Sequence, residues 1–324
     1  MRPSVSVIVC THTDRRLELL VECVDSLNAN ARPPHEVLVV VDSNPDLYAR
    51  LPDRLPPAVS ILESRGSGAS EARNTGIAAA TGDLVAFIDD DAVADPDWLE
   101  HLTAPFADPA VVATGGRAVP RWERPNRILP PELYWVVGCT YKGHPTSPQP
   151  LSRPIGCTMA ARRDAILEAG GFPHDFGPSG PQPKSHSNEE IAVSLRLREA
   201  HGDRSIWYAP GAVVHHFVPA ARTTWTYLWQ RCYVEGVSKA DVRLRFGAAA
   251  MGFDRGYARH TLLPAIARYA AHGLTPRGAA SRRWALAAAG GLLTTAAGYA
   301  GRLLTAGRRP ARGARPRPVQ TVRS

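Results

Sequence analysis

Short apolar runs alternate with amphipathic helical patterns along the first ninety residues, and this alternation limits the possible folds more than any other feature. Four runs have the length and composition of buried strands, at residues 5–10, 35–42, 58–64 and 83–89. A helical pattern follows the first run, and another, "SEARNTGIAAAT", lies between the third and the fourth. This order predicts an α/β fold with a doubly wound, mainly parallel sheet and helices on both faces.

Acidic side chains stand where two of these predicted strands end. Asp42 closes the second strand, and Asp89, Asp90 and Asp91 close the fourth. Such sheets bind ligands at the carboxyl ends of their strands, so we expect all four acids on one rim. A solvated acidic turn is one interpretation. We favour another, in which a carboxylate pair two residues apart holds a divalent cation, Mg²⁺ or Mn²⁺, against a diphosphate.

The pattern loosens from about residue 120. Residues 142–153 and 177–187 are rich in Pro, Gly and Ser, which predicts loops. Between them, "GCTMAARRDAILEAGGF" predicts a strand, a turn and a short helix. An amphipathic helix over 188–202 begins with Glu189 and Glu190. Two acids at that end suit the helix dipole, and a general base on the second side of a cleft is the functional alternative.

Two further signals leave alternatives open. The segment "RGSGASEAR" follows a strand and opens a helix, as a dinucleotide-binding loop does, but Glu71 stands at its third glycine position. An NAD(P)-dependent oxidoreductase is therefore an alternative with little support. His215 and His216 are adjacent on a predicted strand, so they point to opposite faces. One of them could complete a metal shell while the other packs.

The charge of the chain is concentrated at its end. Thirteen arginines and no acids lie between Arg255 and Arg323. This asymmetry predicts an anionic partner, and we expect a membrane surface rather than nucleic acid because no groove-reading motif is present. The uncharged stretch 284–301 predicts a helix that packs on the body, lies on a membrane surface or, with weaker support, spans a membrane. The Arg/Pro-rich residues 307–324 predict disorder.

The compartment is indicated by the cysteines and by the start of the chain. Five scattered cysteines include no CxxC pair and no metal-like spacing, which predicts reduced thiols. A strand pattern begins at Ser4, so we expect no signal peptide. Together with the basic end, these features predict a cytoplasmic protein that is peripheral on the inner face of the plasma membrane.

Taken in order, seven segments resemble family 2 glycosyltransferases, the inverting enzymes of the GT-A nucleotide-diphospho-sugar fold. They span roughly residues 4–217 and read "VIVCTHTDR", "VVVDSNP", "ARNTGI", "FIDDDAV…PDWLE", "GCTMAARRDAILEAGGF", "NEEIAVSLRLR" and "VVHH". The stretch "HHFVPAARTTWTYLWQRCYVEGVSKA" is similar to bacterial and archaeal members that build cell-surface or lipid-linked glycans. One departure is "VVVDSNP", which has one acid where many members have two.

The resemblance implies a role for each matching residue on the donor side. Thr11 and Asp42 would line the nucleotide base and ribose, and Arg73 would reach the base or the phosphates. Asp89 and Asp90 would contact the ribose and help to order the site.

The resemblance also implies the metal ligands and the base. Asp91, last of the DxD-type triplet, would bind the metal, and His215 would complete the metal shell. Glu190 matches the catalytic acid of the family's "ED" motif, with Glu189 as the alternative because this chain has two glutamates there.

The implied activity is the transfer of a sugar from a nucleotide-diphospho-sugar to a hydroxyl of a glycan or polyprenyl-linked acceptor, by metal-assisted single displacement. A non-catalytic nucleotide-sugar binding protein would need no base at Glu190, and a glycoside hydrolase would need no Asp42 and Arg73. Both remain alternatives. The expected domains are a GT-A domain over 1–245, with a nucleotide-sugar-binding half (1–118) and an acceptor half (119–245), then a helical appendage (246–306) and a tail (307–324).

Overall fold

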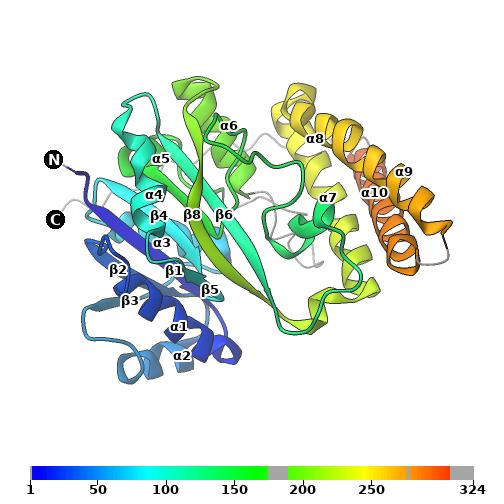
Figure 1. Cartoon of the computed structure of the whole chain (residues 1–324). Coiled ribbons are helices and arrows are strands. Elements are labelled where there is room, and N and C mark those ends of the chain that lie inside the picture. Colours follow the sequence, from blue (N-terminus) through cyan, green and yellow to red (C-terminus); the bar gives the residue numbers. More distant parts are fainter. Residues whose placement is uncertain (1, 174–188, 276–277, 307–324) are drawn as a thin grey trace.

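The computed structural model describes residues 2–173, 189–275 and 278–306, and an eight-stranded mixed sheet forms its centre (Figure 1). The strand order is β3-β2-β1-β4-β7-β6-β8-β5. The strands are β1 Val5–Thr11, β2 Glu36–Val41, β3 Val59–Glu63, β4 Leu84–Asp89, β5 Ala92–Ala94, β6 Ala113–Trp122, β7 Thr158–Arg162 and β8 Ile206–Val218. The first four strands are parallel to one another and β6 is parallel to β8, whereas β7 is antiparallel to both of its neighbours.

Helices cover both faces of the sheet, because its central strands are apolar on both sides. In β1, for example, Val5, Val7 and Val9 face one buried core and Ile8 faces the other. Helices α1, α2 and α4 pack into the first core and α3, α5 and α6 into the second. Their bounds are α1 Leu17–Asn28, α2 Pro45–Arg50, α3 Ala69–Ala79, α4 Trp98–Thr103, α5 Arg163–Glu168 and α6 Glu189–His201.

The sheet confirms the four strands predicted from the sequence and adds two that were not predicted, β5 and β6. Because β1, β2 and β4 are parallel neighbours, their carboxyl ends meet at one edge, as expected. The predicted loop at 177–187 and the predicted tail at 307–324 lie outside the described residues.

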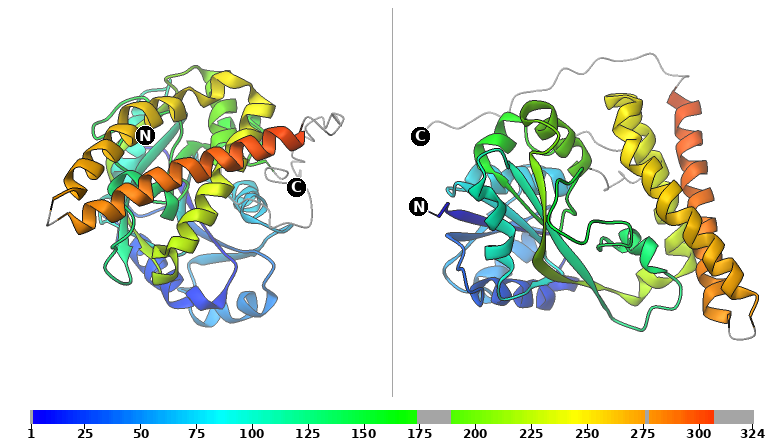
Figure 2. Two further views of the ribbon diagram at one scale, coloured as in Figure 1. Left: turned by 90° about the vertical axis from the view of Figure 1, so that its right-hand side faces the viewer. Right: turned by 45° about the horizontal axis from the view of Figure 1, so that its top comes forward.

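Four helices after β8 form a separate layer beside the sheet, seen on the right of Figure 1. They are α7 Trp225–Phe246, α8 Gly252–Tyr257, α9 Leu263–Gly273 and α10 Ala279–Ala306, with a π-helical turn at Ala258–Leu262 before α9. Helix α10 crosses α7 and lies beside α9 (Figure 2).

Glycines let α10 and α7 approach closely. A Cβ atom on Gly236 would lie 2.0 Å from the carbonyl oxygen of Thr295, and one on Gly298 would lie 2.2 Å from that of Tyr233. Of the alternatives for residues 284–301, the structure therefore shows a helix packed on the body. Within the described residues, no helix combines the length and the hydropathy that a membrane-spanning segment requires.

Candidate active site

The acid cluster lies where β4 ends and the chain turns into β5. Strand β5 pairs antiparallel with β8, so that Ala92 lies opposite His216. The backbone N–H of Phe217 donates to the carbonyl of Asp91 over 2.7 Å. This short pairing carries β8 across the end of β4 and brings one histidine to the acids.

Asp89, Asp91 and His216 form a group that can hold a divalent metal. Their ligand atoms all lie within 4.8 Å of one another. The Nε2 atom of His216 is 3.1 Å from Asp91 Oδ1 and 3.8 Å from Asp89 Oδ2. Asp91 Oδ1 is buried and accepts no aligned hydrogen bond from any described residue. A buried carboxylate is costly unless a positive group lies beside it. The imidazolium of His216 is one such group, and a divalent cation would be another.

Asp91 and His216 hold each other in charged form. Burial acts to raise the pKa of Asp91, but His216 and Arg16 outweigh it and lower that pKa to about 2. Burial acts to lower the pKa of His216, but Asp91 outweighs it and raises that pKa to about 10. A bound metal would replace the proton on the imidazole.

The structure corrects the histidine that the resemblance selected. His215 points to the other face of β8, where its Nε2 lies 3.0 Å from Asp95 Oδ1 and its side chain is 44% exposed. His216 is the histidine that joins the acid cluster. Neighbouring residues of a strand point to opposite faces of the sheet, so an alignment error of one residue selects the histidine on the wrong face.

Asp90 is oriented by two neighbours. Thr11 Oγ1 donates to Asp90 Oδ2 over 2.7 Å, and Arg16 Nη1 donates to Asp90 Oδ1 over 2.8 Å. The same Arg16 nitrogen lies 3.1 Å from Asp91 Oδ2. Arg16 was not predicted from the sequence, because an arginine just before a helix is common. The position of Arg16 beside Asp90 and Asp91 depends on how α1 packs against the sheet.

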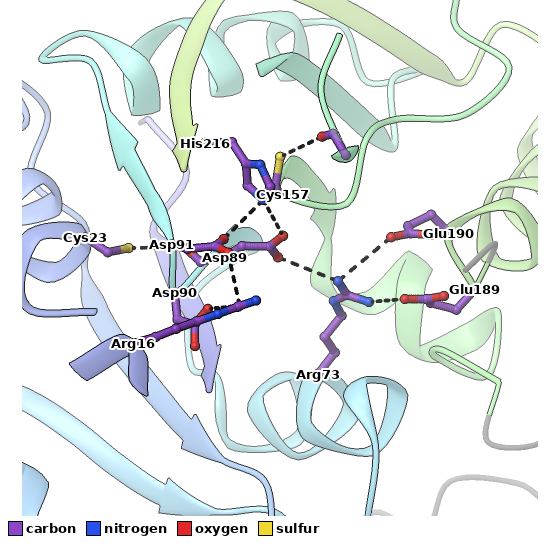
Figure 3. A network of polar contacts seen from close by, with 11 residues as sticks. Arg16, Cys23, Arg73, Asp89, Asp90, Asp91, Cys157, Glu189, Glu190 and His216 are labelled. Atoms are coloured by element: carbon purple, nitrogen blue, oxygen red, sulfur yellow. Dashed lines mark hydrogen bonds and ion pairs between the residues drawn. The ribbon is translucent and has the colours of Figure 1, made fainter. Parts of the chain in front are cut away.

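Arg73 links the acid cluster to the second candidate pair (Figure 3). Its buried guanidinium lies 2.7 Å from Glu189 Oε1, 3.8 Å from Glu190 Oε1 and 3.9 Å from Asp89 Oδ1. Burial and the adjacent Glu189 charge raise the pKa of Glu190 to about 7. Glu189 therefore forms an ion pair with Arg73. Glu190, by contrast, has a pKa at which it can accept or release a proton near neutral pH.

Asp42 follows β2 and contacts the loop before α3. Its Oδ2 accepts a 2.8 Å hydrogen bond from the backbone N–H of Gly68, whose φ of +104° favours glycine. Ser43 Oγ donates to Asp42 Oδ1 over 2.8 Å. Asp42 thus stands at the rim with the other acids, although it contacts none of them directly.

Two cavities meet beside Glu190. The first, of about 380 Å³, contains most of the donor-side residues expected from the sequence. The second, of about 280 Å³, has largely apolar walls to which α7, α8 and α10 contribute. Both are lined by Asp89, Gly138, Glu190 and Arg231. The residues of the first cavity that were predicted are Thr11, Asp42, Arg73, Asp89, Asp90, Glu189 and Glu190.

Sequence reasoning did not anticipate Arg222 and Arg231, which line the first cavity from the segment after β8. Their only signal was the cluster of basic and aromatic residues around "TTWTYLWQRCYVEG". The second cavity as a whole was also not anticipated, because its walls come from segments far apart in the chain.

Comparison with known proteins agrees with this geometry. Residues 6–170 match the family described as Glycosyl transferase family 2. The chain is 35% identical over 251 residues to the glucosyl-dolichyl phosphate glucuronosyltransferase of Haloferax volcanii, a match that covers 76% of this chain and 79% of that protein. It is 27% identical to the succinoglycan biosynthesis protein ExoM of Rhizobium meliloti, over 72% of each chain.

The fold is shared with a solved structure, the mannosyltransferase PcManGT from Pyrobaculum calidifontis in complex with GDP-Man and Mn²⁺. The TM-score is 0.62 at 22% identity, over 93% of this chain and 88% of that one. The predicted GT-A fold and the predicted enzyme class, a glycosyltransferase, are confirmed. This chain belongs to glycosyl transferase family 2.

Proposed function

We propose that the enzyme moves a sugar, with inversion, from a nucleotide-diphospho-sugar in the first cavity to an acceptor hydroxyl in the second. The observation that carries this proposal is the position of Glu190, which lines both cavities. A base at that boundary can reach an acceptor on one side while the donor lies on the other.

The donor side is rich in groups that suit a nucleoside diphosphate. Asp42 and the backbone around Gly68 would bind ribose hydroxyls. Thr11, which donates to Asp90, lines the same cavity. Asp89, Asp91 and His216 would hold Mg²⁺ or Mn²⁺, which when bound supplies positive charge for the leaving diphosphate. Arg222 and Arg231 add fixed positive charge to the same cavity.

The acceptor side depends on Glu190. Its carboxylate removes the proton of the acceptor hydroxyl while the oxygen bonds to the anomeric carbon. The bond from that carbon to the diphosphate breaks on the opposite face, which inverts the centre. A pKa of about 7 suits this role, because a base works best when its pKa is near the operating pH. Glu189 is less suited, since its carboxylate lies 2.7 Å from Arg73.

A lipid-linked acceptor is supported by the archaeal relative, which is a glucosyl-dolichyl phosphate glucuronosyltransferase. The outer face of α10 supports the same class. Leu286, Leu293 and Leu304 are 59%, 70% and 73% exposed. Steps of seven and eleven residues place them within about 20° of one helical face. Arg282 and Arg283 are exposed at the start of this helix.

An exposed leucine row beside arginines fits an anionic lipid surface. We therefore propose that the enzyme works at a membrane surface, peripherally and on the cytoplasmic side, with the second cavity directed to a lipid-linked acceptor.

A donor screen tests the proposal. UDP- and GDP-sugars are titrated by calorimetry with Mn²⁺ or Mg²⁺, and nucleoside diphosphate release is followed when a lipid-linked sugar acceptor is added. We expect one donor class to bind in a metal-dependent way, and Asp91→Asn to lower turnover by about 10². Donor binding that is indifferent both to EDTA and to Asp91→Asn would contradict the proposed metal site.

A further inference from the structure

The second ring nitrogen of His216 contacts a buried thiol. The Nε2 atom of His216 faces Asp91 Oδ1 at 3.1 Å, on the side where a metal would lie. On the other side of the ring, Nδ1 lies 3.7 Å from Cys139 Sγ. Within the part of the chain that the structure describes, no other group forms a hydrogen bond with Nδ1. Cys139 is fully buried, so water does not reach this side of the ring through it.

The direction of this contact follows from where the protons lie. A metal on Nε2 needs the lone pair of that nitrogen, so the remaining ring proton lies on Nδ1. The imidazolium that pairs with Asp91 also carries a proton on Nδ1. In both forms Nδ1–H of His216 donates and Cys139 Sγ accepts. The thiol proton of Cys139 has its own acceptor, because Sγ lies 3.7 Å from the carbonyl oxygen of Val137.

The backbone around Cys139 is fixed on both sides. The 3₁₀ helix Pro131–Val137 ends at Gly138, whose φ of +77° favours glycine. Cys139 then donates its backbone N–H to a carbonyl of that helix over 3.1 Å. Thr140 exchanges two 2.9 Å hydrogen bonds with Ala118 of β6. The thiol is therefore presented by a rigid segment, as a group that orients a metal ligand must be.

Two other buried thiols lie near the metal group, but their hydrogen bonds go only to the backbone (Figure 3). Cys23 Sγ donates to the carbonyl oxygen of Asp89 over 3.6 Å. Cys157 Sγ donates to that of Gly138 over 3.7 Å. Of these three thiols, Cys139 is the one whose sulfur contacts a side chain that can bind the metal.

We propose that Cys139 is a positioning residue for the metal site, whose sulfur accepts the Nδ1–H of His216 and so holds Nε2 toward Asp91. This inference rests on the proposed function, since it assumes that His216 binds the metal. It adds a residue that acts through the ligand rather than on the metal. Without that acceptor the imidazole either turns or keeps a buried N–H unpaired, and both outcomes weaken metal binding.

Manganese binding by two variants of nearly equal size tests this role. Serine and alanine fill almost the same space, but only serine keeps a hydrogen-bond acceptor. Electron paramagnetic resonance of free Mn²⁺ measures the affinity of the full chain with saturating UDP or GDP. We expect Cys139→Ala to weaken Mn²⁺ binding by about 10-fold or more, and Cys139→Ser to stay within about threefold of the unmodified protein.

Cys232→Ala is the matched control, because it removes another buried thiol from a position that lines neither cavity. It should leave the Mn²⁺ affinity unchanged. A role in packing alone predicts that Cys139→Ala and Cys139→Ser weaken Mn²⁺ binding equally, and that outcome would overturn the proposal. Normal Mn²⁺ affinity in Cys139→Ala would overturn it as well.

A second measurement needs no substitution at Cys139. The ¹H–¹⁵N NMR spectrum of the unmodified protein, with Mg²⁺ and the nucleotide, reports which ring nitrogen of His216 carries the proton. The signals of His216 are those that are missing in His216→Ala. We expect the proton on Nδ1, where Cys139 accepts it. A ring without a proton on Nδ1 would overturn the proposal even if the variants at Cys139 do not fold.

The proposed function has a separate readout in the same experiment. Asp91→Asn should weaken Mn²⁺ binding whatever the role of Cys139 is, because Asp91 belongs to the metal group itself. Weak binding by Asp91→Asn together with normal binding by Cys139→Ala would leave the metal site in place and remove only the positioning role. An unmodified protein that binds neither nucleotide nor Mn²⁺ would contradict the proposed function.

Discussion

His215 and His216 are adjacent in the chain, but their side chains lie in different surroundings. His216 is buried between Asp91 and Cys139, whose Sγ lies 3.7 Å from its Nδ1. His215 is half exposed and pairs with Asp95. A metal-ligating histidine commonly uses its second ring nitrogen in a supporting contact, and Cys139 offers one to His216.

This difference gives the first prediction. His216→Ala should weaken Mn²⁺-dependent binding of UDP or GDP by about 10-fold or more, because a ligand is lost. His215→Ala is the matched control and should change the affinity less than about twofold, the range of an exposed polar contact. Calorimetry with and without EDTA measures both. A larger loss for His215→Ala would restore the assignment drawn from the sequence.

The environment of Glu190 gives the second prediction, which concerns pH. A general base must be deprotonated, so kcat/KM should rise with pH and level off above about 7. Burial and the charge of Glu189 raise the pKa of Glu190, so Glu189→Gln should lower that pKa. The substitution also frees Arg73 to approach Glu190, which lowers the pKa of Glu190 further. The acidic limb of the profile should then move to lower pH. A limb that stays in place or moves upward would show that Glu190 does not control it.

At the scale of elements, the loop before β7 helps to position the base on α6. A Cβ atom on Gly156 would lie 2.1 Å from Glu190 Oε1, so only glycine leaves the carboxylate where it is. Gly156→Ala should displace the base and lower transfer by about 10², the cost of a misplacement near 1 Å. Donor affinity should stay close to normal.

Gly252→Ala is the control for this third prediction, because a Cβ atom there meets nothing within 4 Å. Kinetics and nucleotide titration on both variants measure the effect. Full activity in Gly156→Ala would mean that Glu190 can move freely, and that its position at the boundary is not needed.

The outer face of α10 gives the fourth prediction. Serine at Leu286, Leu293 and Leu304 together should reduce sedimentation with vesicles of phosphatidylcholine and phosphatidylglycerol by about 10-fold or more, since each leucine contributes roughly 1.5–3 kcal/mol when buried. Added salt should weaken the binding of the unmodified protein, because headgroup attraction is screened. Tyr257, Leu262 and Leu292 line the second cavity and α10 packs on α7, so substitutions test this surface more cleanly than a deletion.

Two controls accompany the vesicle experiment. Tyr48→Ser changes an exposed apolar residue of α2, at the other end of the molecule from α10 (Figure 1), and should leave binding unchanged. Vesicles of phosphatidylcholine alone should recover little protein. Equal recovery on both kinds of vesicle, or an unaffected triple variant, would contradict a membrane surface at α10.

The elements differ in how far the sequence predicts them. Strands β1, β2 and β4 are nearly continuous apolar runs, and such runs are typical of strands buried on both faces. Strand β6 contains Gly115, Gly116 and Pro120, which disfavour strands, and pairing with β7 and β8 makes it a strand. Strand β5 has three residues, too few for any pattern.

The choice between His215 and His216 also depended on a long-range pairing that the sequence does not reveal. It depends on which residue of β8 lies opposite Ala92, and that pairing is a contact between segments more than a hundred residues apart. The acids were easier, because their place at the end of an apolar strand is itself a local signal.

At the scale of the whole molecule, helices that follow β8 help to form the candidate active site. Only residues 246–306 were expected as an appendage, whereas α7 was expected in the acceptor half, and the domain boundaries stay a prediction. Yet α8 and α10 line the second cavity together with the segment before β7, and α10 lies against α7 (Figure 2). A cavity formed by such distant segments leaves no motif in the sequence. This arrangement places α10, which carries the exposed leucines, beside the proposed acceptor site.

The transfer rate of Glu190→Gln, measured beside its donor affinity, tests the central claim most directly. Glutamine keeps the shape of the side chain but cannot accept the proton. The account predicts that transfer falls by roughly 10²–10⁴ while the affinity for the nucleotide-sugar changes less than about twofold, and that Glu189→Gln retains more activity. Transfer at the normal rate in Glu190→Gln, or a collapse only in Glu189→Gln, would contradict a base at the boundary of the two cavities.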